Sequence, residues 1–321
     1  MELKNVLLIG GSGFVGGWIA SSLSQRGVAV TIPTRHRDNT KKLIMLPTVR
    51  MVEANAHDPQ VLGELMQGQD AVINLVGVLH DNDSRLPYGK GFAAAHVDLP
   101  RTIIDAMKAS GVRRLVHMSA LNAALNGPSE YLCSKGEGEA IVRAAMGQLE
   151  ITIFRPSVIF GPDDAFFNTF AKLLKLFPIL PLGGGAARFQ PVFVGDVARV
   201  FVDCLTLGST FGQTYDLCGP KVYTLRELVE YTGQLLGKSP RIIDLGDGGW
   251  AYLQAGLLWL LPNPPMSPDN LRSMEVDSVS DGSHDYPNWQ PTPLEAVAPG
   301  YLSPTEIGQL RLDRYRLRAG R

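Results

Sequence analysis

The sequence predicts an α/β protein with a doubly wound parallel sheet and a smaller C-terminal α/β domain. Short apolar blocks of β type alternate with amphipathic helical patterns over the first 155 residues, as in parallel sheets with helices on both faces. A glycine-rich segment follows the first block directly. After Arg155, prolines and three glycines at 183–185 interrupt the rhythm. We therefore expect a first domain over residues 1–160, with a return to it at 191–217, and a second domain mainly over 161–321.

The elements of the first domain follow from hydrophobic periodicity. Strands are predicted at residues 6–9, 28–32, 49–53, 71–76, 114–119 and 151–155. Helices are predicted at residues 14–23, 61–66 and 100–110, the last with a proline at its first position. In the second domain, Thr224 with Glu227 and Ser303 with Glu306 form capping boxes that predict two helix starts.

Composition excludes several classes of protein. Thirty basic residues against 31 acidic ones give a net charge of −1, which offers nucleic acid no overall attraction. The three cysteines include no CxxC pair, and the six histidines lack HxxxH or HExxH spacing. We therefore expect no metal and a reducing compartment. No export signal precedes the first apolar block, so the sequence predicts a cytoplasmic protein, with a peripheral position at the inner membrane as the alternative.

Two features of the C-terminal part bear on partners. Residues 250–261 form the most apolar stretch, too short to span a bilayer; it is either a buried helix or a contact for an apolar ligand or interface. The terminus carries Arg311, Arg314, Arg316, Arg318 and Arg321. These arginines either stabilise a helix end or dock to anionic lipid or an acidic protein surface. No transmembrane segment is predicted, and the oligomeric state is left open.

The glycine-rich segment lies directly after the first predicted strand and directly before a helix. It contains Gly10, Gly11, Ser12, Gly13, Phe14, Val15 and Gly16. Glycines permit a tight turn and let a pyrophosphate approach the helix N-terminus without interference from a Cβ. The pattern favours dinucleotide binding over a purely structural turn. A P-loop would need a lysine after its last glycine, and a nucleophile elbow would need glycine in place of Phe14.

The end of the second predicted strand indicates which dinucleotide binds. An acidic residue there would hold a ribose 2′-hydroxyl, whereas an arginine would accept a 2′-phosphate. The chain has Arg35 and Arg37 at this point, and the first carboxylate is Asp38. Because a guanidinium group can bind a 2′-phosphate, these arginines predict NADP(H) in preference to NAD(H). The alternative is a solvated basic loop.

Tyr131 and Lys135 are four residues apart, on one face of a predicted helix. A nearby ammonium is expected to lower the pKa of the phenol, which could then exchange protons with a carbonyl or hydroxyl group. Ser119 ends the fifth predicted strand, at the sheet edge where such folds bind ligands. The three residues are thus candidates for acid/base catalysis.

These motifs resemble the short-chain dehydrogenase/reductase superfamily in its extended form, the NAD-dependent epimerase/dehydratase family. More narrowly they resemble the atypical branch that contains the NADPH-binding accessory subunit of respiratory complex I and stand-alone bacterial relatives. The resemblance rests on residues 10–16, 74–77, 116–121, 131–135, 155–157 and 190–197.

The resemblance implies a Rossmann domain, a C-terminal substrate domain and a nicotinamide close to Tyr131 and Lys135. It further implies cofactor contacts at Asn55, Ala56, Leu75, Val76, Gly77, Met118, Ser119, Pro156, Ser157 and Val158. Asn55 stands where the family usually has an acidic residue beside adenine, and Leu121 stands where extended members often have the helper hydroxyl.

Two hypotheses follow. In the first, the protein is an NADP(H)-dependent oxidoreductase or epimerase-like enzyme that uses Tyr131, Lys135 and Ser119 on a small molecule. The apolar stretch at 250–261 favours a hydrophobic, quinone-like substrate over a sugar nucleotide. In the second, the protein binds NADPH for stability, as an assembly or sensor component without turnover. The intact Tyr131 and Lys135 pair favours the first.

Overall fold

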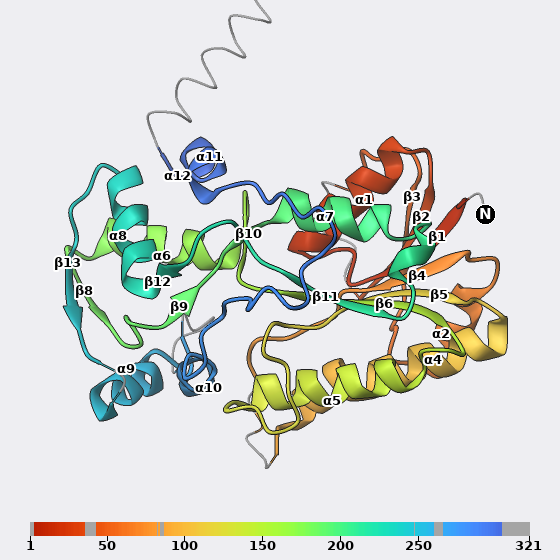
Figure 1. Ribbon diagram of the computed structural model, residues 1–321, viewed down its shortest axis with the longest axis horizontal. Coiled ribbons are helices and arrows are strands. Elements are labelled where there is room, and N and C mark those ends of the chain that lie inside the picture. Colours follow the sequence, from red (N-terminus) through yellow and green to blue (C-terminus); the bar gives the residue numbers. More distant parts are fainter. Residues whose placement is uncertain are drawn as a thin grey trace, which may run out of the picture. The chain divides into compact units, whose positions relative to one another are not determined.

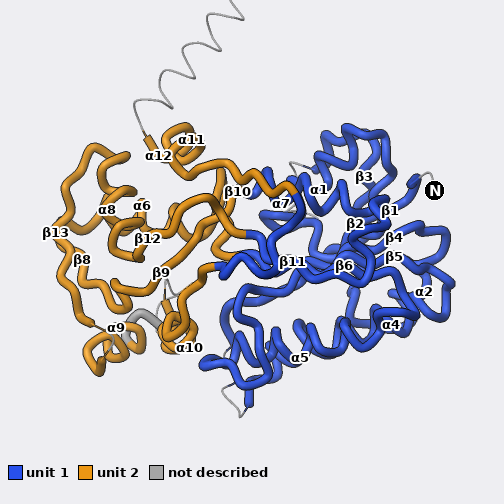
Figure 2. Tube along the Cα trace, in the orientation of Figure 1, with its two compact units in different colours: residues 1–156, 194–217, 280–287 blue, residues 157–193, 218–279, 288–321 orange. Residues whose placement is uncertain are grey.

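The computed structural model describes residues 3–35, 43–81, 83, 87–246, 248–259 and 266–303 (Figure 1). The chain divides into two compact units (Figure 2). Unit 1 is made of three segments, Met1–Pro156, Val194–Leu217 and Ser280–Pro287. Unit 2 comprises Ser157–Phe193, Cys218–Val279 and Asn288–Arg321.

A seven-stranded sheet forms the centre of unit 1, in the order β11-β6-β5-β4-β1-β2-β3. Every neighbouring pair is parallel. The strands are β1 (Asn5–Ile9), β2 (Ala29–Thr34), β3 (Val49–Glu53), β4 (Ala71–Asn74), β5 (Arg114–Met118), β6 (Glu150–Pro156) and β11 (Gln213–Leu217). The predicted doubly wound parallel sheet is therefore confirmed.

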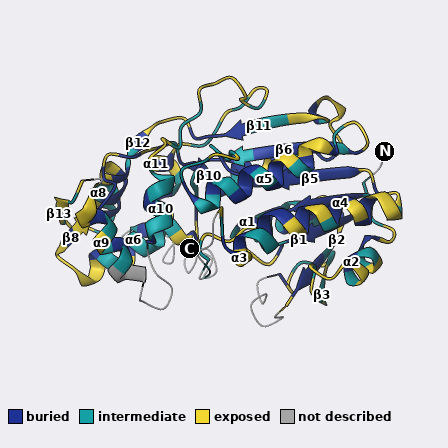
Figure 3. Cartoon of the chain, turned by 90° about the horizontal axis from the view of Figure 1, so that it is seen from below, coloured by how far each residue is buried: buried dark blue, intermediate teal, exposed yellow. Residues whose placement is uncertain are grey.

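Helices cover both faces of this sheet. They are α1 (Phe14–Gln25), α2 (Pro59–Met66), α4 (Leu99–Ser110), α5 (Glu130–Ala144) and α7 (Val194–Asp203). Helices α1 and α7 pack together on one face, and α2, α4 and α5 lie side by side on the other (Figure 1). Leu7, Ile9, Val72, Leu115 and Ile151 of the sheet are buried against apolar side chains of α2, α4 and α5, and buried residues colour the strands in Figure 3.

Strand β4 ends at Asn74, two residues earlier than predicted. The Asn74 Oδ1 atom accepts a hydrogen bond from the Val76 N–H at 3.2 Å. This side-chain bond competes with the sheet ladder and turns the chain out of the strand at the sheet edge.

The helix predicted to begin at Pro100 also begins elsewhere. A short α3 (Lys90–Phe92) and a π-helical turn η2 (Ala93–Asp98) precede α4 without a break. Pro100 has no N–H to donate to the His96 carbonyl and would clash with it in a regular α-helix, which the wider π turn avoids. The His96 carbonyl instead faces α5, where a Cβ on Gly138 would lie only 1.9 Å from its oxygen.

Within its described residues, unit 2 contains three two-stranded sheets. These pair β7 (Ile159–Phe160) with β10 (Val192–Phe193), β8 (Ile179–Leu182) with β13 (Arg241–Asp244), and β9 (Arg188–Phe189) with β12 (Tyr223–Thr224). Its helices are α6 (Ala165–Leu176), α8 (Leu225–Leu235), α9 (Gly249–Trp259), α10 (Pro268–Ser273), α11 (Leu294–Val297) and α12 (Pro299–Leu302). Phe160, Phe167, Leu225, Leu228 and Val229 are fully buried at the centre of its core.

The capping box predicted at the start of α8 is confirmed, because Thr224 and Glu227 exchange the expected hydrogen bonds. The box predicted at Ser303 and Glu306, and the arginine-rich terminus, extend outside the described residues. Within the described ranges, the helices lack the combination of length and apolar character that crossing a bilayer requires.

Candidate nucleotide and catalytic site

The glycine turn between β1 and α1 is built by backbone alone. Gly10 has a positive φ of 82°, a conformation that glycine adopts without strain. A Cβ on Gly16 would lie 2.5 Å from the Gly11 Cα, so this position admits no larger residue. Ser12 and Gly13 are exposed, and Phe14 begins the helix. The turn thus leaves Ser12 and Gly13 exposed directly before the start of α1.

The N-terminus of α1 differs from those of α2 and α5. Asp58 caps α2 and Ser129 caps α5 through side-chain hydrogen bonds, whereas α1 has no side-chain cap and no acidic residue in its first turn. The amide groups of Val15 and its neighbours at this helix end are positioned for an anion. The turn therefore fits a dinucleotide pyrophosphate.

The segment after β4 lies against this turn. A Cβ on Gly10 would come within 3.1 Å of the Val76 nitrogen and 3.3 Å of the Leu75 Cβ. Gly77, one residue further, is exposed. The structure therefore brings the predicted contacts at residues 75–77 together with the glycine turn.

Lys135 reaches the carboxyl ends of the central strands from α5. Its Nζ atom donates a hydrogen bond to the Met118 carbonyl at 3.2 Å, and a Cβ on Gly77 would lie 3.1 Å from the same Nζ. Burial lowers the pKa of Lys135 to about 8, partly offset by the negative charge of Glu139. The ammonium is thus held between the ends of β4 and β5.

Tyr131 lies one helical turn before Lys135, partly buried, with its ring edge-on to the rings of Phe92 and His96. Burial raises the pKa of Tyr131 to about 12. The expectation that Lys135 lowers the pKa of this phenol is therefore wrong, because desolvation dominates. Tyr131 is thus protonated at neutral pH.

Ser119 follows β5 and is buried beside Glu139. Burial opposes ionisation of Glu139, but hydrogen bonds from Arg155 and Arg143, with the Ser119 hydroxyl beside them, hold the pKa of Glu139 below its ordinary value. The Ser119 Oγ atom nevertheless makes no hydrogen bond of good geometry to any residue in the described ranges. A buried hydroxyl without a well-formed bond is costly, and a polar ligand group would relieve this cost.

His96 belongs to the candidate site, although it was not predicted from the sequence. The Val78 N–H donates to its Nε2 atom at 3.0 Å, and its Nδ1 atom lies 2.8 Å from the Ser134 Oγ. Because Nε2 accepts, we assign the proton of the neutral ring to Nδ1. Burial, aided by Lys135, lowers the pKa of His96 to about 2. The ring thus connects the segment after β4 to the helix that carries Tyr131.

His117 on β5 is a second buried histidine beside Lys135. Its Nδ1 atom lies 3.2 Å from the Asn74 Nδ2, and burial with the Lys135 charge lowers its pKa to about 3. Neither His117 nor His96 belongs to a metal-binding spacing, so the sequence did not assign either of them to this site. For His96 the only indirect signal was the proline at 100, which predicts a helix irregularity near that residue.

The residues predicted to contact adenine and ribose are described in part. Arg35 follows β2 directly and is exposed. Asn55 is exposed and its Oδ1 accepts from the His57 N–H at 3.2 Å, which leaves its side-chain amide group available to a base. Ala56 packs at the edge of the core. Burial and the charge of Arg35 lower the pKa of His57, so Arg35 lies close to this corner. Arg37 lies outside the described residues.

The last three predicted contacts fall on the boundary between the units. Pro156 ends β6 in unit 1, whereas Ser157 and Val158 belong to unit 2. In unit 2 the Ser157 Oγ bonds to the carbonyl and hydroxyl oxygens of Ser278, both at 2.9 Å. The roles of these residues toward a nucleotide stay predictions.

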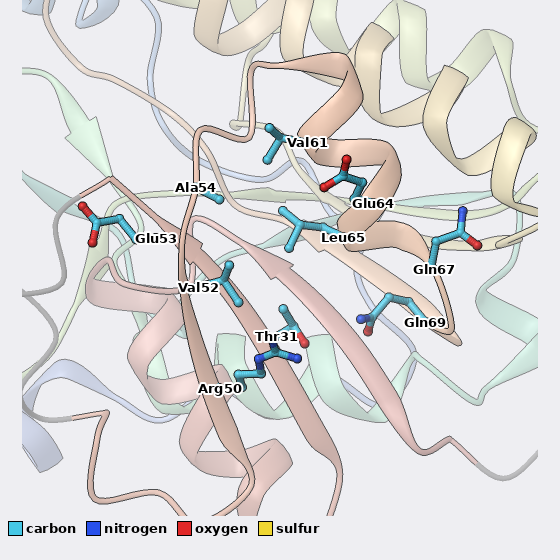
Figure 4. Close-up of a pocket in the computed structure, with 10 residues that line it drawn as sticks. All are labelled: Thr31, Arg50, Val52, Glu53, Ala54, Val61, Glu64, Leu65, Gln67 and Gln69. Carbon is cyan, nitrogen blue, oxygen red and sulfur yellow. The ribbon is translucent and has the colours of Figure 1, made fainter.

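A hollow of about 470 Å³ lies between β3 and α2 (Figure 4). Arg50, Val52 and Glu53 of β3 and Glu64 and Leu65 of α2 are among the residues that line it. None of the predicted cofactor residues lines this hollow, so we do not assign it to the nucleotide.

One group in the described part of the chain brings three metal-type ligands together. Atoms of Asp216, Asp281 and His284 lie within 4.8 Å of one another. The positive charge of Arg155 acts on Asp216, and Asp281 already accepts two hydrogen bonds from Ser283. These neighbours oppose cation binding, and we assign no metal here.

The sequence of this chain matches a known family and is similar to several known proteins. Residues 6–218 match the model of the NAD dependent epimerase/dehydratase family. Mouse (Mus musculus) mitochondrial NADH dehydrogenase (ubiquinone) 1 alpha subcomplex subunit 9 is 34% identical over 230 residues, which cover 70% of the chain and 59% of that subunit. The chain thus spans about three fifths of the length of that relative.

Two further matches carry enzymatic names, one found by sequence and one by fold. Ceramide reductase from Caulobacter vibrioides is 29% identical over 254 residues, covering 79% of the chain and 76% of the reductase. The structure of the dTDP-glucose 4,6-dehydratase DesIV from Streptomyces venezuelae, with NAD and TYD bound, aligns with a TM-score of 0.68 and 24% identity. The alignment covers 77% of the chain and 86% of DesIV, and it shows a shared fold.

Proposed function

The chain belongs to the NAD-dependent epimerase/dehydratase family, and on that premise we propose that it is an NADP(H)-dependent oxidoreductase acting on a hydrophobic carbonyl or alcohol substrate. The observation that carries the proposal is the arrangement at the end of the central strands. Tyr131 and Lys135 share one face of α5, with the ammonium held by the Met118 carbonyl and the buried Ser119 hydroxyl lacking a well-formed hydrogen bond. These are the donors that a carbonyl reduction requires.

The residues divide the work as follows. A bound nicotinamide supplies or accepts the hydride. Ser119 donates a hydrogen bond that orients the substrate oxygen. Tyr131, protonated at neutral pH because burial raises its pKa to about 12, donates its proton to that oxygen as reduction proceeds. Lys135 holds ribose hydroxyls and stabilises the negative charge that then develops on the phenol oxygen.

The preference for NADP(H) is supported by charge at the end of β2. Arg35 follows this strand, and residues 29–35 contain no carboxylate that could hold a ribose 2′-hydroxyl. Titration of NADPH and NADH, followed by nicotinamide fluorescence, tests this preference. We expect Arg35→Ala to weaken NADPH binding about tenfold and leave NADH binding unchanged. Arg50→Ala, at an exposed arginine of β3, serves as the control, and equal losses for both nucleotides would contradict the proposal.

The hydrophobic substrate is supported by the ceramide reductase relative and by the apolar α9 of unit 2. Long-chain keto amides and a short-chain quinone, each offered with NADPH, test the substrate class by loss of nicotinamide absorbance. In Tyr131→Phe we expect turnover to fall at least about a hundredfold while NADPH affinity changes little. Undiminished turnover in this variant would remove Tyr131 from the mechanism.

A second candidate function is a non-catalytic, NADPH-binding assembly component. It is favoured by the relative named as a subunit of mitochondrial NADH dehydrogenase. This function predicts tight nucleotide binding, no turnover on any substrate in the panel, and thermal stabilisation by NADPH that Tyr131→Phe leaves intact. It also allows peripheral association with a membrane complex in place of a purely cytoplasmic location.

A further inference from the structure

Six large apolar side chains are exposed where four elements of unit 2 meet. Leu176 ends α6 and is 74% exposed, and Trp250 on α9 is 72% exposed. Between them, exposed apolar residues lie on the chain after α6, on β8, on β13 and on α9. We call the set the apolar patch, and it consists of Leu176, Phe177, Ile179, Ile243, Trp250 and Leu253.

The first part of the patch is continuous because of strand register. Only Phe177 and Pro178 separate α6 from β8. In the parallel pair of β8 and β13, Ile179 lies beside Arg241, and Pro181 lies beside Ile243. Alternation along a strand places these residues on one face, and exposed residues colour β8 and β13 in Figure 3. Leu180 and Leu182 alternate with them and are buried in the core.

Helix α9 extends this face. The Gln254 Nε2 atom donates to the Pro181 carbonyl at 2.6 Å, and its Oε1 accepts from the Gly183 N–H at 3.2 Å. Ala251 and Ala255 are fully buried, and a Cβ on Gly183 would lie 2.6 Å from that of Ala251. Helix α9 therefore packs through its alanines against the end of β8. Trp250 and Leu253, three residues apart, are left on the exposed side.

Positive charges border the same surface. Lys172 and Lys175 are exposed on the last turns of α6, and Arg241 lies on the exposed face of β13. The Lys238 Nζ atom donates to the carbonyls of Leu174 and Lys175, both at 3.0 Å, which fixes its ammonium group at the C-terminal end of α6.

The acidic residue of β13 does not share this face. By alternation Asp244 points to the side opposite Ile243, where its Oδ1 accepts from the Gly246 N–H and its Oδ2 lies 3.9 Å from Arg226. The apolar patch is thus bordered by cations on the face it presents.

We propose that the apolar patch docks this protein on the surface of an anionic lipid bilayer. Tryptophan, phenylalanine and leucine side chains enter the boundary between headgroups and acyl chains, and lysines beside them attract anionic headgroups. Charge complementarity selects this occupant. A second copy of the chain would bring Lys172, Lys175 and Arg241 against the same cations, whereas a bilayer containing phosphatidylglycerol presents only opposite charge.

Co-sedimentation with vesicles tests the proposal in the full-length protein. One vesicle set contains phosphatidylcholine alone, and the other contains added phosphatidylglycerol. We expect binding to the second set, weakened about tenfold or more by the double variant Leu176→Ser/Trp250→Ser and about tenfold by Lys172→Glu/Lys175→Glu. Matched controls are Leu125→Ser and Lys90→Glu, which alter an exposed leucine and an exposed lysine of unit 1.

Retained NADPH binding and an unchanged melting temperature show that the variants are folded, and neither readout depends on turnover. Lipid binding therefore stands or falls separately from the proposed enzymatic function. The proposal is overturned if added phosphatidylglycerol does not increase binding of the wild-type protein to vesicles, or if the patch variants bind these vesicles as tightly as the controls do. It is also overturned if light scattering shows a dimer that the patch variants dissociate while vesicle binding is absent.

Discussion

The two ends of the proposed nucleotide site are built differently, one from backbone atoms and the other from side chains. The turn at residues 10–16 is formed by backbone and by the absence of side chains, with no capping or acidic side chain at the start of α1. The end around Tyr131 is formed by buried titratable side chains, His96, His117, Lys135 and Glu139. The first end selects a ligand by the space it leaves, and the second by the charges it holds.

This difference predicts different sensitivities. A steric cradle fails when a methyl group is added and is indifferent to pH. A buried set of ionisable groups tolerates small changes of shape but responds to protons, because each group carries a shifted pKa. Substitution and pH can therefore separate the two ends.

The largest effect is expected at the steric end. In Gly16→Ala the new Cβ would lie 2.5 Å from the Gly11 Cα and 2.6 Å from the Gly10 oxygen. We expect NADPH affinity to fall at least about a hundredfold and the free energy of unfolding to fall by about 3 kcal/mol. Gly17→Ala is the matched control, since its Cβ would meet nothing closer than 3.9 Å. Similar behaviour of the two variants in urea unfolding and NADPH titration would refute the steric account.

A smaller effect for each residue, confined to the titratable end, is expected on acidification. Unfolded histidines have pKa values near 6.5, whereas burial lowers those of His117 and His96 to about 3 and about 2. The folded protein thus binds fewer protons below pH 6.5, and the free energy of unfolding decreases as the pH falls. We expect a loss of about 2 kcal/mol per histidine between pH 7 and pH 5. Urea unfolding across this range should give a shallower pH dependence for His96→Asn, and parallel curves would contradict the prediction.

The smallest effect concerns Lys135. Because burial lowers its pKa to about 8, the ammonium is present below that pH and is lost as the pH rises through it. We expect NADPH affinity to weaken by up to about tenfold between pH 7 and pH 9. Lys135→Met should bind weakly at both pH values with no such change. If wild type and variant show the same pH dependence in fluorescence titrations, Lys135 does not hold the nucleotide.

The steric end was readable from the sequence, and the titratable end only in part. The turn was predicted from the spacing of Gly10, Gly13 and Gly16 between a strand and a helix, and this context is local in the sequence. Tyr131 and Lys135 were found because four residues make one helical turn. His96 was missed because the π turn before Pro100 and the approach of Gly138 bring it to α5, and contacts between elements leave no periodic pattern. The predicted lowering of the Tyr131 pKa was wrong for the same reason, because the desolvation that raises this pKa depends on which residues pack around the ring.

The three-segment composition of unit 1 has a consequence for how the protein is made. Strand β11 completes the sheet beside β6, and the His284 carbonyl accepts from the Asp216 N–H at 2.8 Å on the outer side of β11. Tyr286 packs against Phe154 and Tyr215. Most of unit 2 must therefore be synthesised before the last segment of unit 1, which covers the outer edge of β11. A nascent chain released near residue 160 would leave β6 as an unpaired edge strand, prone to pair with other chains.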